Sequence, residues 1–302
     1  MPDEPFVDAH MHFWDKSVPS LQWAWLEPGY RFRKWTSSAE IDAPRYTAPE
    51  FLTEAAGTGM AGAVHVHCAD PIGDPAVETR WLESLAVDTG WPHAIVGACE
   101  LEAPEAAVSI REQARCSRFR GVRAFASPQR LDPDASTAAM DALAEAGCSL
   151  EVRRHHDEFE PIDELAARWP TVTIFLSQGC LPLERTPDQL DEWSRAMRRL
   201  AARPNVVCKI STVVGASQPE CTVERVRPWV LGCIDAFGAD RCVMGTNFPV
   251  DRPYCSLGRL VEVYRESIAG LSAAEREAVL AGTAERVYRL DLAATIGSGV
   301  PA

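Results

Sequence analysis

Short apolar runs alternate with stretches that carry apolar residues at helical spacing along most of the chain. Each apolar run is rich in Val, Ile, Ala or Leu, as expected for parallel strands that are buried on both faces. The first strand is predicted to begin at Phe6. The other seven are predicted at residues 61–67, 94–100, 119–125, 149–153, 171–176, 205–210 and 241–246. Because a helical stretch follows each strand, the pattern predicts a single α/β domain over residues 1–302, a (β/α)8 TIM-like barrel.

The first strand carries Asp8, His10 and His12 at alternate positions, after the apolar pair Phe6 and Val7. Alternate side chains of a strand point to the same face. Active sites of such barrels lie at the C-terminal ends of the strands. We therefore predict that His10 and His12 open the floor of a pocket there. The alternative is that the two residues only cap the strand with polar groups.

Polar residues at the other strand ends are the remaining candidates for this pocket. Arg123 has the planar guanidinium that suits a substrate carboxylate, and its alternative role is an ion pair at the rim. Lys209 is expected to hold an anionic group or a developing oxyanion, and its alternative role is a buried pair with Glu151 or Glu100. The full set is His65, His67, Glu100, Arg123, Arg153, Gln178, Lys209, Asn247 and Asp251.

The second predicted strand contains another His-x-His pair, His65 and His67. We expect these two residues to face His10 and His12, so that four imidazoles surround the pocket and contact the substrate. Close packing of imidazoles lowers their pKa values and favours neutral rings near pH 7.

A long segment rich in Trp, Tyr and Phe covers residues 16–49. Long segments without regular structure are often functional in compact domains. We predict an insertion near the barrel mouth that forms a lid or a wall over the site. The alternative is a cap on the barrel bottom or a subunit contact.

The composition favours a small-molecule partner. With 46% hydrophobic and 24% charged residues and a net charge of -13, the chain would repel phosphate backbones and anionic lipids. We therefore expect no nucleic-acid and no membrane partner. No run of about 18 apolar residues is present, and the acidic N-terminal residues do not resemble a secretory signal, which predicts a cytoplasmic protein. A homodimer is a further expectation.

The ten cysteines are spread along the chain without a C-x-x-C pair. Several fall in predicted strands, where a thiol packs as a small apolar group. We therefore interpret the cysteines as packed thiols and predict no disulfide framework. Cys180 is the exception, because it lies in a Gly-Cys-Leu-Pro turn beside the expected pocket.

The motifs at the strand ends resemble those of the amidohydrolase superfamily. They are similar in particular to its lactonase-like branch, which includes sugar-lactone and pyrone-dicarboxylate lactonases. The resemblance implies a TIM-like barrel that hydrolyses a lactone, an amide or a related bond with water. The matching motifs are Asp8-Ala-His-Met-His-Phe-Trp-Asp15, Phe119-Arg-Gly-Val-Arg123, the Leu-Pro after strand six, Asn205-Val-Val-Cys-Lys-Ile-Ser211 and Gly245-Thr-Asn-Phe-Pro-Val-Asp251.

The resemblance also implies roles for particular residues. His10 and His12 match the first-strand pair that binds metal or polarises the scissile carbonyl. The strand-six His of the family falls on Gln178, and the strand-eight Asp falls on Asn247. Because neither amide supplies charge or good basicity, we expect no required metal or other cofactor. The alternative is one divalent metal such as zinc at His10 and His12.

The expected function is a hydrolase that opens a lactone or similar cyclic ester of a small acidic or aromatic metabolite. His10, His12, Asn247 and Asp251 are the expected catalytic residues, with Asp251 as the base, because an amide has no proton-accepting state near neutral pH. Gln178 is expected to contact the substrate. The alternatives are a non-hydrolytic decarboxylase, lyase or cyclase, and an inactive small-molecule-binding relative.

Overall fold

The structure, a computed structural model, describes residues 4–27, 43–70, 73–124, 131–182, 184–215 and 218–292. Its centre is an eight-stranded parallel sheet, in which the order of the strands around the sheet follows the chain. The strands are β1 (Phe6–Met11), β4 (Met60–Val66), β5 (Ala94–Cys99), β6 (Phe119–Ala124), β7 (Ser149–Val152), β8 (Ile174–Leu176), β9 (Val206–Ile210) and β10 (Cys242–Met244).

The sheet curls until its first and last strands meet. The backbone N–H of Asn247, just after β10, donates to the carbonyl of His10 at 2.7 Å, and the N–H of His12 donates to the carbonyl of Phe248 at 2.8 Å. The segment after β10 therefore closes the ring against the end of β1. The observed fold confirms the predicted (β/α)8 barrel.

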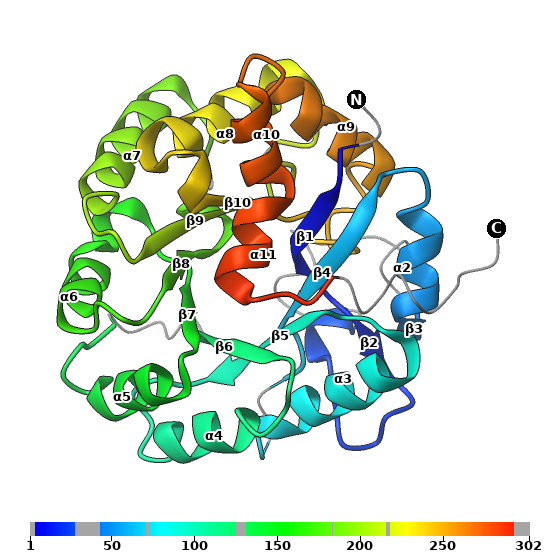
Figure 1. The fold of residues 1–302 in the computed structure, drawn as a ribbon, viewed down its shortest axis with the longest axis vertical. Helices are drawn as coiled ribbons and strands as arrows, with labels where there is room; N and C mark the ends of the chain where they lie inside the picture. The colour runs from blue at the N-terminus through cyan, green and yellow to red at the C-terminus, as the bar shows by residue number, and fades with distance from the viewer. Residues whose placement is uncertain are drawn as a thin grey trace.

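Helices surround this ring on its outer side (Figure 1). They are α2 (Ala48–Glu54), α3 (Ala76–Thr89), α4 (Ala106–Gln113), α5 (Thr137–Ala146), α6 (Glu160–Arg168), α7 (Pro187–Leu200), α8 (Val223–Phe237) and α9 (Leu257–Ser267). Local signals explain several of their ends. The Ser256 hydroxyl caps α9 by accepting from the Arg259 N–H at 3.2 Å, and α5 ends at Gly147 with φ of +60°. Within the described ranges, every helix is too short or too polar to span a bilayer.

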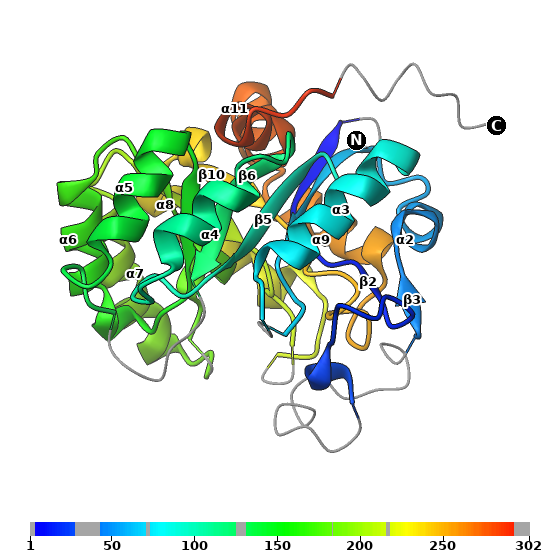
Figure 2. The same cartoon turned by 90° about the horizontal axis from the view of Figure 1, so that it is seen from below.

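Two further helices, α10 (Ala273–Glu277) and α11 (Thr283–Tyr288), are joined by one π-helical turn (Ala278–Gly282). Figure 2 shows α11 across one end of the barrel, on the same side as the N-terminus. The Tyr288 ring stacks on Phe175 of β8, with 4.6 Å between ring centroids. Tyr288 and Phe175 belong to an apolar cluster that also contains Val64, Val96 and Val207 from the strands. This packing fills the N-terminal end of the barrel, so the strand C-termini remain for a site.

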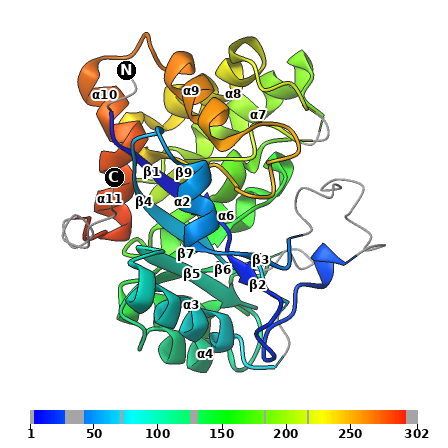
Figure 3. The ribbon, with the colours of Figure 1, turned by 90° about the vertical axis from the view of Figure 1, so that its right-hand side faces the viewer.

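The described parts of the aromatic-rich segment lie at the opposite end from α11 (Figures 2 and 3). There β2 (Trp14–Asp15) pairs with β3 (Arg45–Tyr46), and a short 3₁₀ turn spans Ala24–Leu26. The Trp25 indole donates to the carbonyl of Cys68 at 2.6 Å. This contact holds the turn against the segment that follows β4. The central part of the segment, residues 28–42, lies outside the described residues.

The interpretation of the cysteines as packed thiols is wrong for Cys221 and Cys255, which form a disulfide. The bond joins the segment before α8 to the loop between β10 and α9. Eight other cysteines are free, and six of them are buried, as expected for packed thiols. The pairing had no signal in the sequence because it depends on two loops that meet only in the folded barrel.

Candidate active site

The end of β1 departs from simple alternation. Asp8 pairs with Ala63 and Met11 pairs with His65, so three steps along β1 match two steps along β4. The register therefore shifts by one residue here, as at a β-bulge, which changes the face on which later side chains lie. Met11 packs in the apolar layer between strands and helices. By alternation, the neighbouring His10 then points to the barrel interior.

The bulge also separates Asp8 from the histidine pair. The Asp8 carboxylate accepts hydrogen bonds from the backbone N–H of Thr246 at 2.9 Å and from that of His10 at 3.0 Å. Asp8 therefore ties β1 to the closing segment after β10. The expectation that Asp8 shares one face with His10 and His12 is wrong, because strict alternation ends at the bulge.

His12, Asn247 and Asp251 form a continuous row at the closing seam. The Asn247 amide nitrogen Nδ2 donates to Asp251 Oδ1 at 2.8 Å, and Asn247 Oδ1 lies 3.1 Å from His12 Nε2. His12 Nδ1 lies 2.7 Å from the carbonyl oxygen of Val66 and must donate to it. Burial lowers the pKa of His12 to about 3, with further lowering from His65 and Arg123. The ring is therefore neutral, and its Nε2 carries a lone pair.

His10 lies beside His12, with 5.0 Å between ring centroids. The residue is fully buried, and within the described part of the chain neither ring nitrogen has a hydrogen-bond partner. Burial, followed by His12 and Lys209, lowers the pKa of His10 well below its ordinary value. Gly245 allows this approach of the two strands, because a Cβ there would lie 2.5 Å from His10 Cβ. Burying an imidazole without a hydrogen-bond partner lowers the stability of the fold, unless a ligand binds its nitrogens.

Asp251 supplies the carboxylate of the row. It is almost fully buried, and its Oδ2 has no partner among the described residues. Burial raises the pKa of Asp251 to about 8, although the Asn247 hydrogen bond and the nearby Arg185 act in the opposite direction. The structure therefore brings together the four residues expected to be catalytic, His10, His12, Asn247 and Asp251.

The second histidine pair is arranged differently from the expectation. His65 Nε2 lies 3.3 Å from Glu78 Oε1, and His67 Nδ1 contacts Glu78 Oε2, so both rings bind a carboxylate from α3. The His65 ring still meets His12 edge-on, at 6.1 Å between centroids. The sequence did not predict that a buried helix carboxylate would bind both rings of the second pair.

Lys209 takes the alternative arrangement that the sequence left open. It is fully buried and forms an ion pair with Glu151. The Tyr288 hydroxyl donates to Glu151 Oε1 at 2.7 Å, and the Lys209 ammonium lies 5.4 Å from the centre of the Phe175 ring. Burial lowers the pKa of Lys209, which Glu151 opposes. This pair lies in the floor of the barrel, beside the stacked rings of Phe175 and Tyr288.

We expect Lys209→Met to lower the free energy of unfolding by about 3 to 5 kcal/mol, because it leaves the Glu151 carboxylate buried without its cation. Urea denaturation followed by far-ultraviolet circular dichroism measures this loss. The control is the double variant Lys209→Met with Glu151→Gln, which removes both charges, keeps an acceptor for the Tyr288 hydroxyl and should be close to wild type. If the single variant is as stable as wild type, the pair does not stabilise the barrel.

Other polar residues lie at the ends of neighbouring strands. Arg123 is half-buried, and its Nη1 donates to the carbonyl of His67 at 3.4 Å. Gln178 after β8, Thr212 after β9 and Asn247 after β10 all have left-handed backbones, with φ of 57°, 54° and 57°. Such conformations are costly for residues other than glycine and cluster at functional sites. Gln178 and Asn247 were predicted as site residues, whereas Thr212 was not.

Glu78 and Arg185 were not predicted as site residues from the sequence. The sequence around Glu78 did not indicate a functional role, because a single acidic residue in a helical pattern is usually exposed to solvent. Arg185 follows the Leu-Pro motif, which was a usable signal. Its guanidinium donates to the carbonyls of Thr212 and Val213. Burial lowers the pKa of Arg185 to about 10, and the attraction of Asp251 opposes this shift. Arg185 is therefore the cation beside Asp251.

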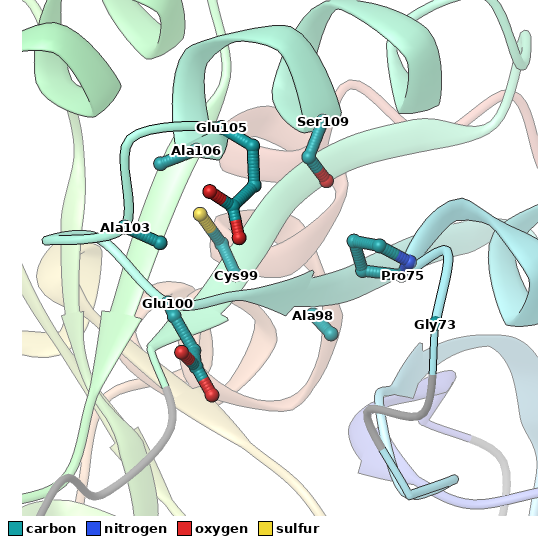
Figure 4. Close-up of a pocket in the computed structure, with 9 residues that line it drawn as sticks. All are labelled: Gly73, Pro75, Ala98, Cys99, Glu100, Ala103, Glu105, Ala106 and Ser109. Atoms are coloured by element: carbon teal, nitrogen blue, oxygen red, sulfur yellow. The ribbon is translucent and has the colours of Figure 1, made fainter.

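Glu100, which the sequence placed among the strand-end candidates, lines a separate small pocket. Figure 4 shows the Glu105 carboxylate beside the Cys99 thiol, with the Glu100 side chain directed away from that thiol. The pocket has a volume of about 140 Å³ and lies between the end of β5 and the start of α4. Its other lining residues come from the segments around Pro75 and Ser109. Neither the His10–His12 pair nor Asp251 lines this pocket.

Two groups of side chains can be tested as metal ligands. His12 Nε2 and Asn247 Oδ1 face each other with lone pairs at 3.1 Å. Two atoms bound to one zinc ion at about 2.1 Å each stand roughly 3.0 to 3.4 Å apart, so this separation fits a shared ion. Donation from the other ring nitrogen to a carbonyl is also typical of a metal-binding histidine. His10, whose ring nitrogens have no hydrogen-bond partner within the described part of the chain, lies beside this pair, with 5.0 Å between the centroids of the two rings.

The second group is His65, Cys68 and Glu78, whose donor atoms lie within 4.8 Å of one another. In this group the His65 Nδ1 accepts from the backbone N–H of Phe13 at 3.0 Å. A neutral His65 therefore carries its proton on Nε2 and donates it to Glu78, which leaves no lone pair there for a metal. The proton arrangement favours the first group.

Known proteins resemble this chain over nearly its full length. The uncharacterized protein y4mH of Sinorhizobium fredii is 30% identical over 302 residues, covering 96% of this chain and 100% of the relative. The L-fucono-1,5-lactonase of Burkholderia multivorans is 29% identical over 301 residues, covering 94% and 96%. A crystal structure of an amidohydrolase from Burkholderia multivorans with bound zinc has a TM-score of 0.74 at 23% identity, covering 95% and 100%.

The expectation that no cofactor is required is wrong. The Burkholderia multivorans structure contains zinc. The similarly folded 5-carboxyvanillate decarboxylase of Novosphingobium aromaticivorans, with a TM-score of 0.64 at 13% identity over 96% of this chain and 97% of that chain, was crystallised with manganese. In this chain His65, Cys68 and Glu78 are also close enough to hold an ion. The error came from treating the amide at Asn247 as the loss of a ligand, although an amide carbonyl oxygen can bind a metal ion.

The amidohydrolase family matches residues 7–290 of this chain. The match includes the histidine pair of β1 and the row from Asn247 to Asp251. It confirms the resemblance noted in the sequence and the prediction of an amidohydrolase-type hydrolase. With this match and the shared barrel, the chain belongs to the amidohydrolase family.

Proposed function

We propose that this protein opens a small lactone by attack of water on the ring carbonyl. The observation that carries the proposal is the row of His12, Asn247 and Asp251. It consists of a neutral imidazole with a lone pair, an oriented amide, and a carboxyl group with one oxygen that has no partner among the described residues. The name of the Burkholderia multivorans relative, an L-fucono-1,5-lactonase, supports a lactone as the substrate.

His10 and His12 would hold a divalent metal, with Asn247 Oδ1 as a third donor. A bound ion would polarise the lactone carbonyl and make water more acidic. In its deprotonated form, which predominates above its pKa of about 8, Asp251 accepts the proton of the attacking water on Oδ2 and returns it to the leaving ring oxygen. Asn247 holds the Asp251 carboxylate through its Nδ2 at 2.8 Å, so that the unpartnered Oδ2 is left for this proton transfer.

The substrate side of the site is proposed to use Arg123 and Gln178. The hydrogen bond of Arg123 to the His67 carbonyl orients a half-buried cation, which suits a substrate that carries a carboxylate. We also infer that the described residues 16–27 of the aromatic-rich segment contribute to one wall of the site, because the Trp25 indole binds the backbone just after His67. A homodimer and a cytoplasmic location stay predictions.

We expect the purified protein to convert sugar lactones, including L-fucono-1,5-lactone, or pyrone dicarboxylates to open acids. Reaction in ¹⁸O-water should place the label in the new carboxylate. Dialysis against a strong chelator should remove at least about 90% of the activity, because a catalytic ion supplies several kcal/mol of transition-state stabilisation. Zinc or manganese should restore it.

Two results would contradict this function. Full activity after complete removal of the metal would exclude the proposed role of His10 and His12 as ligands. Release of carbon dioxide from a carboxylated aromatic, without opening of any lactone, would instead favour the decarboxylase alternative.

A further inference from the structure

We propose that Glu78 is a positioning residue that holds His12 in its ligand orientation without touching it. The inference rests on the proposed function, because it assumes that His12 Nε2 binds the metal. Glu78 lies in the first turn of α3, and only 3% of its surface is exposed. A carboxylate at this depth requires partners for both oxygens.

Glu78 collects donors from the end of β4. Its Oε1 accepts from the backbone N–H of Cys68 at 3.1 Å and of Ala69 at 3.0 Å, and lies 3.3 Å from His65 Nε2. Its Oε2 accepts from His67 Nδ1. The carboxylate therefore binds four residues at the end of β4, which are His65, His67, Cys68 and Ala69.

The first route from Glu78 to His12 runs through Val66. Val66 lies between His65 and His67, the two residues whose rings Glu78 binds. The Val66 carbonyl oxygen is the acceptor for His12 Nδ1 at 2.7 Å. By holding both neighbours of Val66, Glu78 keeps this carbonyl in place, and the carbonyl sets the proton of His12 on Nδ1.

The second route runs through His65. His65 Nδ1 accepts from the backbone N–H of Phe13, the residue after His12, at 3.0 Å. The bond from His65 Nε2 to Glu78 requires the ring proton on Nε2, which makes Nδ1 the acceptor. The edge of the His65 ring also packs on the His12 ring. Glu78 thus orients His65, and His65 orients both the backbone and the ring at the end of β1.

The test is the affinity for zinc, measured by competition with a chromogenic chelator on protein freed of metal. Glu78→Gln keeps the size of the side chain but loses its charge and half of its acceptors. We expect it to bind one zinc ion about 10- to 100-fold more weakly than wild type, as found when partners behind a ligand are lost. Circular dichroism and thermal unfolding verify that the variant is folded.

Two control variants make the comparison specific. Glu83→Gln alters another glutamate of α3, which accepts from the backbone of Ser117 and Arg118, and should leave zinc affinity unchanged. Cys68→Ser removes a thiol that would be a ligand only if the metal were bound by His65, Cys68 and Glu78. It should also leave zinc affinity unchanged.

The outcomes separate the alternatives. Unchanged zinc affinity in Glu78→Gln overturns the proposal, and so does loss of zinc binding in both Glu78→Gln and Cys68→Ser, because Glu78 would then be a ligand. If Glu78→Gln does not fold, His65→Phe decides, since it removes the acceptor for Phe13. We expect a several-fold weaker affinity there, and wild-type affinity would reject the inference. Retention of zinc by His12→Ala would contradict the proposed function itself.

Discussion

Replacement of His12 by Ala is expected to remove the bound metal and to lower lactone turnover by about 10³-fold or more. The magnitude follows from the several kcal/mol that a metal ion contributes to a transition state, at about 1.4 kcal/mol for each factor of ten. The fold fixes the proton of His12 on Nδ1, which donates to the Val66 carbonyl. The lone pair is therefore on Nε2, which faces Asn247. Elemental analysis and steady-state kinetics measure the two effects.

The matched control for this prediction is His155→Ala, which alters a histidine that is 45% exposed and pairs with Asp157. This variant should keep both metal and turnover. The free energy of unfolding of His12→Ala should lie within about 1 to 2 kcal/mol of the wild-type value, because residues at the barrel mouth contribute little to the core. A His12→Ala protein that retains metal and turnover would exclude His12 from the site, and one that unfolds would show a structural role.

Asp251→Asn is expected to lower kcat by about 10²- to 10⁴-fold while zinc binding is retained, as for the loss of a general base. The carboxylate is the one acidic group in the row, and its Oδ2 has no partner among the residues that the structure describes. An amide at position 251 keeps the size of the side chain but cannot accept a proton from water. The measurement is kcat at saturating lactone on protein with a known zinc content.

Asn247→Asp is the companion variant for Asp251→Asn. It keeps an oxygen facing His12 Nε2 and should retain zinc, but it replaces the Nδ2 donor to Asp251 with a second carboxylate, so kcat should fall. If Asp251→Asn is nearly as active as wild type, the base lies elsewhere or the reaction does not use water. Loss of zinc in Asp251→Asn would instead show that the residue acts on the metal site.

The order of strands and helices was predictable from the sequence. The strand predicted at residues 205–210 is β9, Val206–Ile210, and the strand predicted at 149–153 is β7, Ser149–Val152. Apolar runs identify buried parallel strands because every side chain in them is covered on one face or the other. The positions of His10, His12 and Asn247 at strand ends follow from the same pattern, since strand C-termini meet at one end of a barrel.

The tertiary structure decided what each polar side chain touches. The bulge between Asp8 and Met11 moved Asp8 away from the histidine pair, and a bulge depends on the register with the neighbouring strand. Lys209 pairs with Glu151, which lies two strands away, and a disulfide joins Cys221 in one loop to Cys255 in another. Buried polar groups must find partners across the fold, and those distances are set by packing rather than by separation along the chain.

The sequence by itself determined the barrel, the family and the candidates His10, His12, Asn247 and Asp251, because each of these depends on local pattern and on motif order. The role of Glu78 and the readiness of His12 to bind a metal were decided only by the tertiary structure. Both depend on where protons lie in a buried network, and a network exists only once β1, β4, α3 and the segment after β10 have been brought together.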